Sequence, residues 1–189
     1  LLNAVNSLAS YKNSLGLTTY IITTDQIYNQ FSYGIHHPLG IRNLSKYLLE
    51  NSSLKPEYLF LIGKGYELPK NNLVSDLVPS MGYPSSDNEF TAKIIDNNLA
   101  PALATGRLPA KTPSDVLNYL EKIQLFNNQP NEIWRKTIIN ITGGGNSFED
   151  ATFANYLRNL SNVCLSVFPL IIFDSYLNVN LIIFCNEDT

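Results

Sequence analysis

Apolar residues in the first third of the chain recur at two spacings, one typical of helices and one typical of strands. The helical stripes consist of Leu1, Val5 and Leu8, then Ile27 and Phe31, then Ile41, Leu44 and Leu48. Gly16 stands where the first helix should stop, and Asp25 is placed to cap the second. Runs of β-branched and aromatic residues predict strands over 18–24 and 57–62.

The middle of the chain continues this alternation. A short strand is predicted over 103–108, and the next helix has the clearest local start signal in the sequence. Thr112 can serve as its N-cap, Pro113 suits the first helical position, and Asp115 adds an acidic residue to the first turn. The helical pattern fades at Asn127.

A third set of signals predicts a strand over 136–142, followed by a helix that Ser147 and Asp150 start as a capping box. Strands that alternate with helices favour an α/β fold with a mainly parallel sheet. Both faces of each predicted strand are apolar, so we expect helices on both faces of that sheet.

The most apolar stretch runs from Val163 to Cys185. Pro169, Asp174 and Asn178 divide it into runs much shorter than the roughly 18 residues of a membrane span. The pattern therefore predicts two buried strands and no transmembrane segment in this chain.

A stretch over 63–99 is too long to be a simple connection, and such loops are often functional. It contains Asp87 and Asn88, and we expect both at the carboxyl edge of the sheet, where open α/β sheets bind ligands. Arg107 is placed to pair with such a carboxylate bidentately, in a structural role. Backbone N–H groups and a calcium ion are the other groups that could hold Asp87. An Asx-turn or helix cap remains the alternative role of this cluster.

The charge balance argues against nucleic acid as a partner. Thirteen Lys and Arg residues against 16 Asp and Glu residues give a net charge of −3 and a pI near 5.3. Proteins that bind the phosphate backbone of a nucleic acid need a positively charged surface. Hydrophobic residues make up 44%, which is enough for a globular core and argues against disorder.

Cysteine and histidine offer few candidates for chemistry. Cys164 and Cys185 cannot form a disulfide scaffold, and both lie among apolar residues where a thiol is usually inert. His36 and His37 are adjacent in a loop, with no second ligand at metal-binding spacing. A pairing of one cysteine with one of these histidines remains the less favoured alternative to a structural role, and the sequence implies no cofactor.

The glycine run at 143–145 follows a predicted strand and precedes a helix, as phosphate-binding loops do. Its spacing argues against that use. A dinucleotide fingerprint would need glycine at Phe148, and Gly-Lys-Ser/Thr occurs nowhere in the chain. An ordinary turn is the favoured interpretation.

Five segments, taken in order, carry a family resemblance. They are IYNQFSYGIHHPLGIRNLSKYL (27–48), EYLFLIGKG (57–65), LVPSMGYPSSDNEFTA (77–92), ATGRLPAKTPSDVLNYLEKI (104–123) and WRKTIINITGGG (134–145). Together they resemble the gingipain-like cysteine peptidases, and most closely the PorU-type proteins of the type IX secretion system. The resemblance covers about residues 18–160.

The resemblance implies a caspase-like, two-lobed α/β peptidase domain. Residues 1–130 would form the first lobe and residues 131–189 the start of an incomplete second, catalytic lobe. The resemblance also implies that the peptidase acts outside the cell or at the outer-membrane surface. The partners would be exported protein substrates or components of the type IX secretion system.

In that family the catalytic histidine and cysteine both lie downstream of the helix that is predicted here to end near Leu160. The resemblance therefore assigns no catalytic residue to this chain, which we expect to be inactive alone. Lys64 and Ala102 stand where the family usually has acidic residues. That departure keeps open a second interpretation, a non-catalytic PorU-like lobe that binds a secretion partner.

Overall fold

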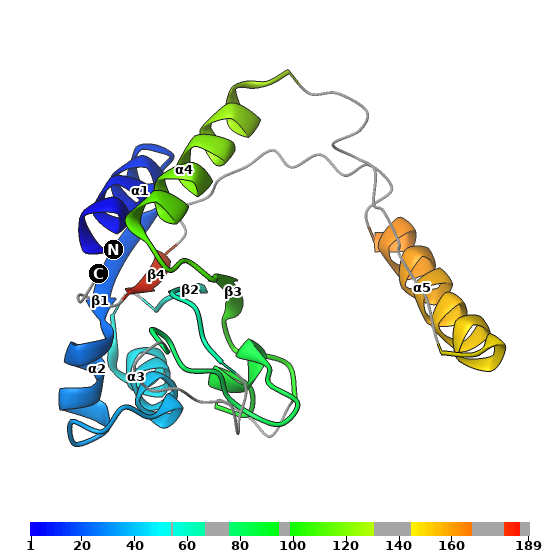
Figure 1. The fold of residues 1–189 in the computed structure, drawn as a ribbon, viewed down its shortest axis with the longest axis horizontal. Coiled ribbons are helices and arrows are strands. Elements are labelled where there is room, and N and C mark those ends of the chain that lie inside the picture. Colours follow the sequence, from blue (N-terminus) through cyan, green and yellow to red (C-terminus); the bar gives the residue numbers. More distant parts are fainter. Residues whose placement is uncertain (54, 67–75, 95–98, 131–144, 168–179, 186–189) are drawn as a thin grey trace. The chain divides into compact units, whose positions relative to one another are not determined.

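The structure is a computed structural model of the 189-residue chain, shown in Figure 1. It describes residues 1–53, 55–66, 76–94, 99–130, 145–167 and 180–185. The chain forms two compact units, one made of Leu1–Asn127 with Tyr176–Thr189, the other of Asn128–Ser175. The lobe boundary expected near residue 130 stays a prediction.

A four-stranded parallel sheet is the centre of the first unit, with the strand order β1-β4-β2-β3. Its strands are β1 (Thr18–Thr23), β2 (Tyr58–Ile62), β3 (Ala104–Leu108) and β4 (Asn180–Cys185). The strands expected near 18–24, 57–62 and 103–108 are thereby confirmed. The one expected at 136–142 lies outside the described residues.

Strand β4, the last strand among the described residues, occupies an inner position in the sheet. Ile183 of β4 is paired with Ile21 on one side and with Phe60 on the other. The apolar stretch from Val163 was expected to contain two strands. One of them is β4, whereas residues 163–167 end helix α5 (Ser147–Val167). Residues 168–179 lie outside the described part, so the other strand stays a prediction. A short apolar run has the same composition in a buried helix as in a strand, so sequence alone does not separate them.

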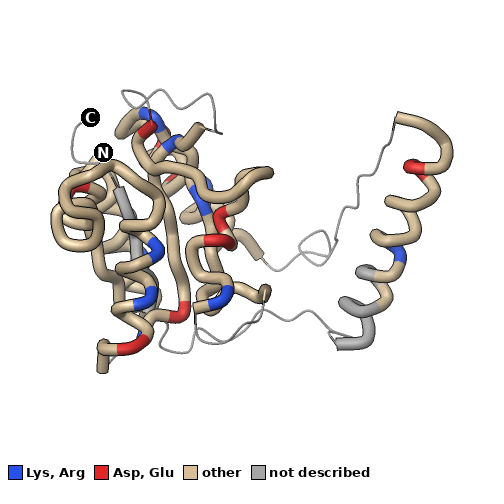
Figure 2. The backbone as a smooth tube through the Cα atoms, turned by 90° about the horizontal axis from the view of Figure 1, so that it is seen from below, with Lys and Arg blue, Asp and Glu red and all other residues tan. Residues whose placement is uncertain are grey.

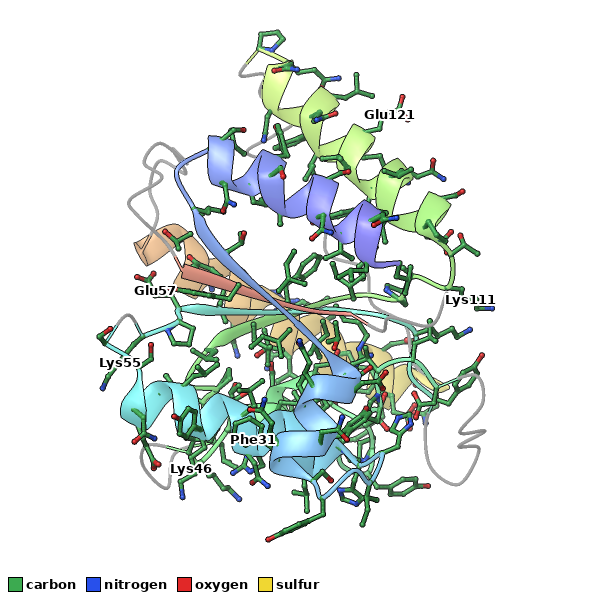
Figure 3. The ribbon with its side chains drawn as sticks, turned by 90° about the vertical axis from the view of Figure 1, so that its left-hand side faces the viewer. Phe31, Lys46, Lys55, Glu57, Lys111 and Glu121 are labelled. Atoms are coloured by element: carbon green, nitrogen blue, oxygen red, sulfur yellow. The ribbon has the colours of Figure 1, made fainter. Side chains whose placement is uncertain are left out.

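Helices cover both faces of the sheet, as expected. Figure 3 shows α1 (Leu2–Ser14) and α4 (Pro113–Asn128) on one side, with α2 (Thr24–Phe31) and α3 (Pro38–Asn51) on the other. Strand β2 supplies side chains to both layers, because successive residues of a strand point to opposite faces. Leu59 and Leu61 pack with the core of α2 and α3, whereas Phe60 and Ile62 pack with α1 and α4.

The N-cap expected at Thr112, before α4, is confirmed. The Asp115 carboxylate accepts the N–H groups of Lys111 and Thr112, both at 2.9 Å, and Thr112 Oγ1 accepts the N–H of Asp115 at 3.4 Å. The two backbone N–H groups are the main cause of the lowered pKa of Asp115.

Two other expected caps are wrong by one or two residues. Helix α2 is capped by Thr23 and not by Asp25, because Thr23 Oγ1 accepts the N–H of Gln26 and the Gln26 side chain accepts the N–H of Thr23. Helix α5 is capped by Asn146 and not by Ser147, with Asn146 Oδ1 accepting the N–H of Glu149 at 3.0 Å. Consecutive polar residues compete for a cap, and local backbone geometry selects among them.

Helix α5 makes up most of the described part of the second unit. Phe148, Phe153 and Tyr156 are exposed on it. No helix in the described ranges is long and apolar enough to cross a bilayer. Figure 2 shows basic and acidic residues interspersed along the described part of the first unit.

Candidate functional site

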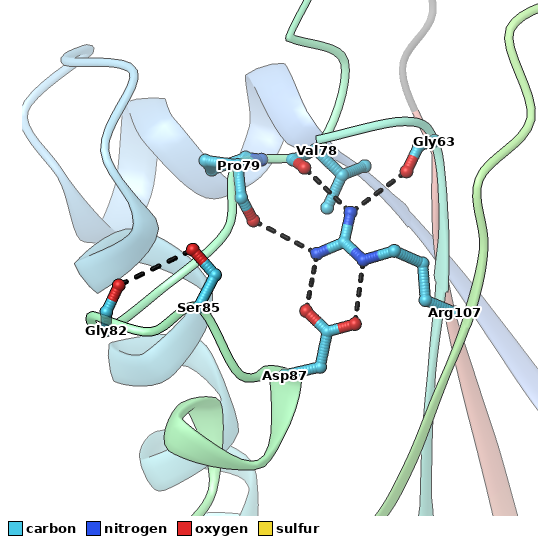
Figure 4. Close-up of polar contacts among 7 residues, drawn as sticks. All are labelled: Gly63, Val78, Pro79, Gly82, Ser85, Asp87 and Arg107. Atoms are coloured by element: carbon cyan, nitrogen blue, oxygen red, sulfur yellow. Dashed lines mark hydrogen bonds and ion pairs between the residues drawn. The ribbon is translucent and has the colours of Figure 1, made fainter. Parts of the chain in front are cut away.

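Arg107 connects the ends of two strands to the loop that carries Asp87 (Figure 4). Its Nε and one terminal nitrogen donate to the two Asp87 oxygens at 2.8 and 2.7 Å. The other terminal nitrogen donates to the carbonyls of Gly63 and Val78 at 2.9 and 2.8 Å, and the Pro79 carbonyl accepts a further bond at 3.1 Å. All five N–H donors of the guanidinium are therefore engaged within the protein.

The location of this pair follows from the sheet. Arg107 is the penultimate residue of β3, where it is paired with Leu61, and Gly63 directly follows β2. Parallel strands end at a common edge, so Asp87 lies at the carboxyl edge, as the sequence predicted. The sequence analysis considered Arg107, backbone N–H groups and a calcium ion as partners of this carboxylate. Among the described residues, Arg107 is the partner found.

Partial burial gives the contact its strength. The Arg107 and Asp87 side chains are 14% and 26% exposed, which leaves the ion pair less screened than one on the open surface. The bidentate geometry also fixes the orientation of the loop, because the two planar groups fit together in one way. Asp87 is therefore an anchor of this loop.

The other candidate residue, Asn88, is exposed on the short 3₁₀ helix η1 (Asp87–Phe90). Its backbone carbonyl accepts the N–H groups of Thr91 and Ala92, at 3.1 and 2.9 Å. Arg42 of α3 donates to the Glu89 carbonyl at 2.6 Å, which holds η1 against α3. Whether these residues line a substrate-binding cleft stays a prediction.

Two glycines let the chain pass close to this anchor. Gly63 has φ +148°, and a Cβ there would lie 2.6 Å from a Val78 side-chain carbon. At Gly65 a Cβ would lie 2.5 Å from the Val78 carbonyl oxygen and 3.2 Å from a terminal nitrogen of Arg107. The sequence motif at 57–65 contained both glycines, but no pattern in it indicated that the Arg107 contacts depend on them.

We expect Gly65→Ala to lower the free energy of unfolding by about 1–3 kcal/mol, because its methyl group would displace the Val78 carbonyl that Arg107 binds. Gly106→Ala is the matched control, since its Cβ would meet nothing nearer than Phe60 at 3.6 Å. Urea unfolding of both variants tests this. Equal stability of the two variants would contradict the close approach at Gly65.

The adjacent histidines diverge, as expected of neighbouring loop residues. His37 is exposed and caps α3, with its Nδ1 accepting the N–H of Leu39 at 3.2 Å. His36 instead stacks on Tyr28, with ring centroids 4.7 Å apart and an interplanar angle of 25°. A pairing of either histidine with Cys164 or Cys185 is not tested, because the side chains of both cysteines lie outside the described part.

Sequence reasoning missed a buried carboxylate next to this region. Asp76 is 2% exposed, and burial raises the pKa of its carboxyl. His36, the N–H of Tyr66 and Arg107 act in the opposite direction. The only signal available in the sequence was an acidic residue beside the apolar pair at 77–78.

Within the described ranges, no three His, Cys, Asp or Glu side chains gather closely enough to hold a metal ion. The expectation of a possible structural calcium stays untested. The geometry provides an ordered loop at the carboxyl edge of a parallel sheet, held by a partly buried arginine.

Comparison with known proteins gives one match. The profile of peptidase family C25 matches residues 1–182, nearly the whole chain. No curated protein and no solved structure matches significantly.

Proposed function

The chain belongs to peptidase family C25, the gingipain family, and from this premise we propose that it is the amino-terminal part of a PorU-type cysteine peptidase. The observation that carries the proposal is the anchored loop. Arg107 and Asp87 order it at the carboxyl edge of the sheet, where open α/β folds bind their ligands.

We propose that the catalytic histidine and cysteine belong to the part of the peptidase that follows this chain. Cysteine peptidases need a thiolate nucleophile and a base within hydrogen-bond reach of each other. This chain would supply the neighbouring wall of the cleft. Asn88, with an exposed amide, would bind the backbone of an extended substrate, while Arg107 is fully engaged and acts only through the loop that it holds.

We propose the carboxy-terminal signals of exported proteins as the substrates, which the complete enzyme would cut or transfer as a sortase at the cell surface. The five sequence segments that resemble PorU-type proteins support this choice over a general digestive peptidase. Other components of the type IX secretion system would then be its partners.

On this proposal, the chain alone has no peptidase activity, because neither nucleophile nor base of the family is assigned within it. Incubation of the purified chain with fluorogenic peptides and with a carboxy-terminal signal peptide measures this. We expect no more peptide cleavage than in a control reaction that contains buffer without protein.

Cys164→Ala and Cys185→Ala serve as controls in the same assay. Turnover that either substitution abolishes, with the circular dichroism spectrum unchanged, would contradict the proposed location of the dyad. It would instead place the nucleophile on α5 or at the end of β4.

A second function, a non-catalytic lobe that binds a secretion partner, is favoured by Lys64. This residue stands where the family usually has an acidic one, and its ammonium lies 5.1 Å from the centre of the Tyr66 ring. An assay of the complete peptidase that this proposal implies distinguishes the two functions. Binding of a signal peptide with cleavage supports the peptidase, and binding without cleavage supports the partner-binding lobe.

A further inference from the structure

The two outer strands of the described sheet, β1 and β3, differ in how their outward main-chain groups are used. In an outer strand, every second residue points its N–H and C=O groups away from the sheet. On β1, side chains of the neighbouring helices bind two of these groups. Asn13 Oδ1 accepts the N–H of Thr19 at 3.1 Å, and Gln26 Oε1 accepts the N–H of Thr23 at 3.1 Å. The outer edge of β1 is therefore closed near both of its ends.

The outer edge of β3 has no such cover among the described residues. The N–H of Ala104 donates to the residue before β2 at 3.0 Å, and the Leu108 carbonyl accepts from the residue after β2 at 2.9 Å. Because main-chain groups alternate in direction along a strand, Thr105 and Arg107 point theirs away from β2. No described segment bonds to the main chain of Thr105 or Arg107 on that side.

The side chains of these two residues do not close the edge either. Thr105 Oγ1 donates to the Leu103 carbonyl at 3.0 Å. The Arg107 guanidinium is fully engaged with Asp87 and with backbone carbonyls, whereas its main chain is free on the outer side. Only the main-chain groups of this edge are therefore available to a ligand.

The chain itself begins a further strand just before this open part. Ala92 and Pro101 form an isolated antiparallel bridge, and the N–H of Ala102 donates to the Thr91 carbonyl at 3.1 Å. This pairing stops before β3 begins. An extended segment could continue it along the open edge, as in complexes in which a peptide adds a strand to a sheet.

Gly106 shapes the surface beside the open edge. It is exposed and is paired in register with Phe60 of β2. A Cβ at Gly106 would lie 3.6 Å from a ring carbon of Phe60. A strand added outside β3 would place one of its side chains next to Gly106 on this face. Because glycine has no side chain to separate the two, a large apolar side chain could reach the Phe60 ring there.

We propose that the edge of β3 at Thr105 and Arg107 binds an extended peptide as an additional strand, with a large apolar side chain of that peptide over Gly106. Two N–H donors and two C=O acceptors at strand spacing match the backbone of another extended chain. The edge is continuous with the candidate site, because Arg107 also holds the loop that carries Asp87. The peptide is the carboxy-terminal signal of an exported protein, and this choice rests on the proposed function.

Amide hydrogen exchange of the intact chain, followed by NMR, first tests whether the edge is open. Thr105 and Arg107 should exchange at least about tenfold faster than Gly106, whose N–H faces β2, because unbonded amides are not protected. Equal protection of the three amides would mean that the edge is already covered and would overturn the proposal. Loss of that protection on dilution would identify a second copy of the chain as the cover.

A carboxy-terminal signal peptide, added in excess over its dissociation constant, should slow the exchange of Thr105 and Arg107 at least about fivefold. Ile21 is the internal control, because its N–H points outward on β1 at the opposite edge of the sheet. Its rate should not change. Peptide binding that leaves Thr105 and Arg107 unprotected would overturn this inference alone. Absence of binding would contradict the proposed substrate, and this inference with it.

Thr105→Pro removes one outward donor without removing a bond to β2, and outer strands tolerate proline at such positions. With an unchanged circular dichroism spectrum, this variant should bind the signal peptide at least about tenfold more weakly. Binding as tight as that of the unsubstituted chain would overturn the proposal.

N-methylation of the signal peptide at alternate residues provides a test in which the protein is unchanged. In an added strand, only every second N–H of the peptide faces β3. One set of alternate methyl groups should therefore abolish the protection of Thr105 and Arg107, while the other set should preserve it. Equal effects of the two sets would overturn the proposal.

Discussion

Arg107→Lys should lower the free energy of unfolding by about 2–4 kcal/mol, although it keeps the positive charge. Lysine has three donors on one nitrogen, whereas Arg107 makes five bonds from a planar fork to four different groups. The substitution would leave backbone carbonyls at the ends of β2 and of the following loop without a donor. Urea unfolding measures the loss.

Arg42→Lys is the matched control for this prediction. Arg42 also binds a backbone carbonyl, that of Glu89, but it makes this bond at the surface of the protein. We expect a loss of at most about 1 kcal/mol. Similar losses for the two variants would mean that Arg107 is not the anchor of the carboxyl edge.

Ile183→Pro should lower the free energy of unfolding by at least about 3 kcal/mol, because β4 is central and proline cannot donate to a strand ladder. In the described part of the chain, β4 is the strand that joins β1 to β2, so a break in β4 weakens both contacts. Thermal unfolding followed by circular dichroism measures the loss.

Ile183→Val keeps the backbone N–H and a β-branched side chain. This substitution should lower the free energy of unfolding by about 1 kcal/mol. If proline and valine have equally small effects, the segment 180–185 does not form the central strand of the folded chain.

The sequence predicted much of the fold because its strands have local signals, such as β-branched and aromatic residues over 18–24 and an apolar run over 57–62. The runs at 18–24, 57–62 and 103–108 became β1, β2 and β3 with errors of one residue at a boundary. The parallel arrangement followed from the intervening helices. The position of β4 could not be predicted in this way, because pairing between residues 21 and 183 depends on tertiary contacts and leaves no local signal.

The site was predictable only in part, for a similar reason. Asp87 and Arg107 were recognisable because carboxylate and guanidinium groups near strand ends have few alternatives to pairing. Asp76 was not recognisable, because it has no distinctive local pattern. The raised pKa of its carboxyl depends on burial, which the sequence does not specify for a single polar residue.

The Asp87–Arg107 contact organises the carboxyl edge, and a double-mutant cycle tests this most directly. The unfolding free energies of the unsubstituted chain, Asp87→Ala, Arg107→Leu and the double variant give the coupling between the two side chains. We predict a coupling of at least about 2 kcal/mol, with the double variant losing much less than the sum of the single losses. A coupling within about 0.5 kcal/mol of zero would show that the two residues act independently and would contradict the account.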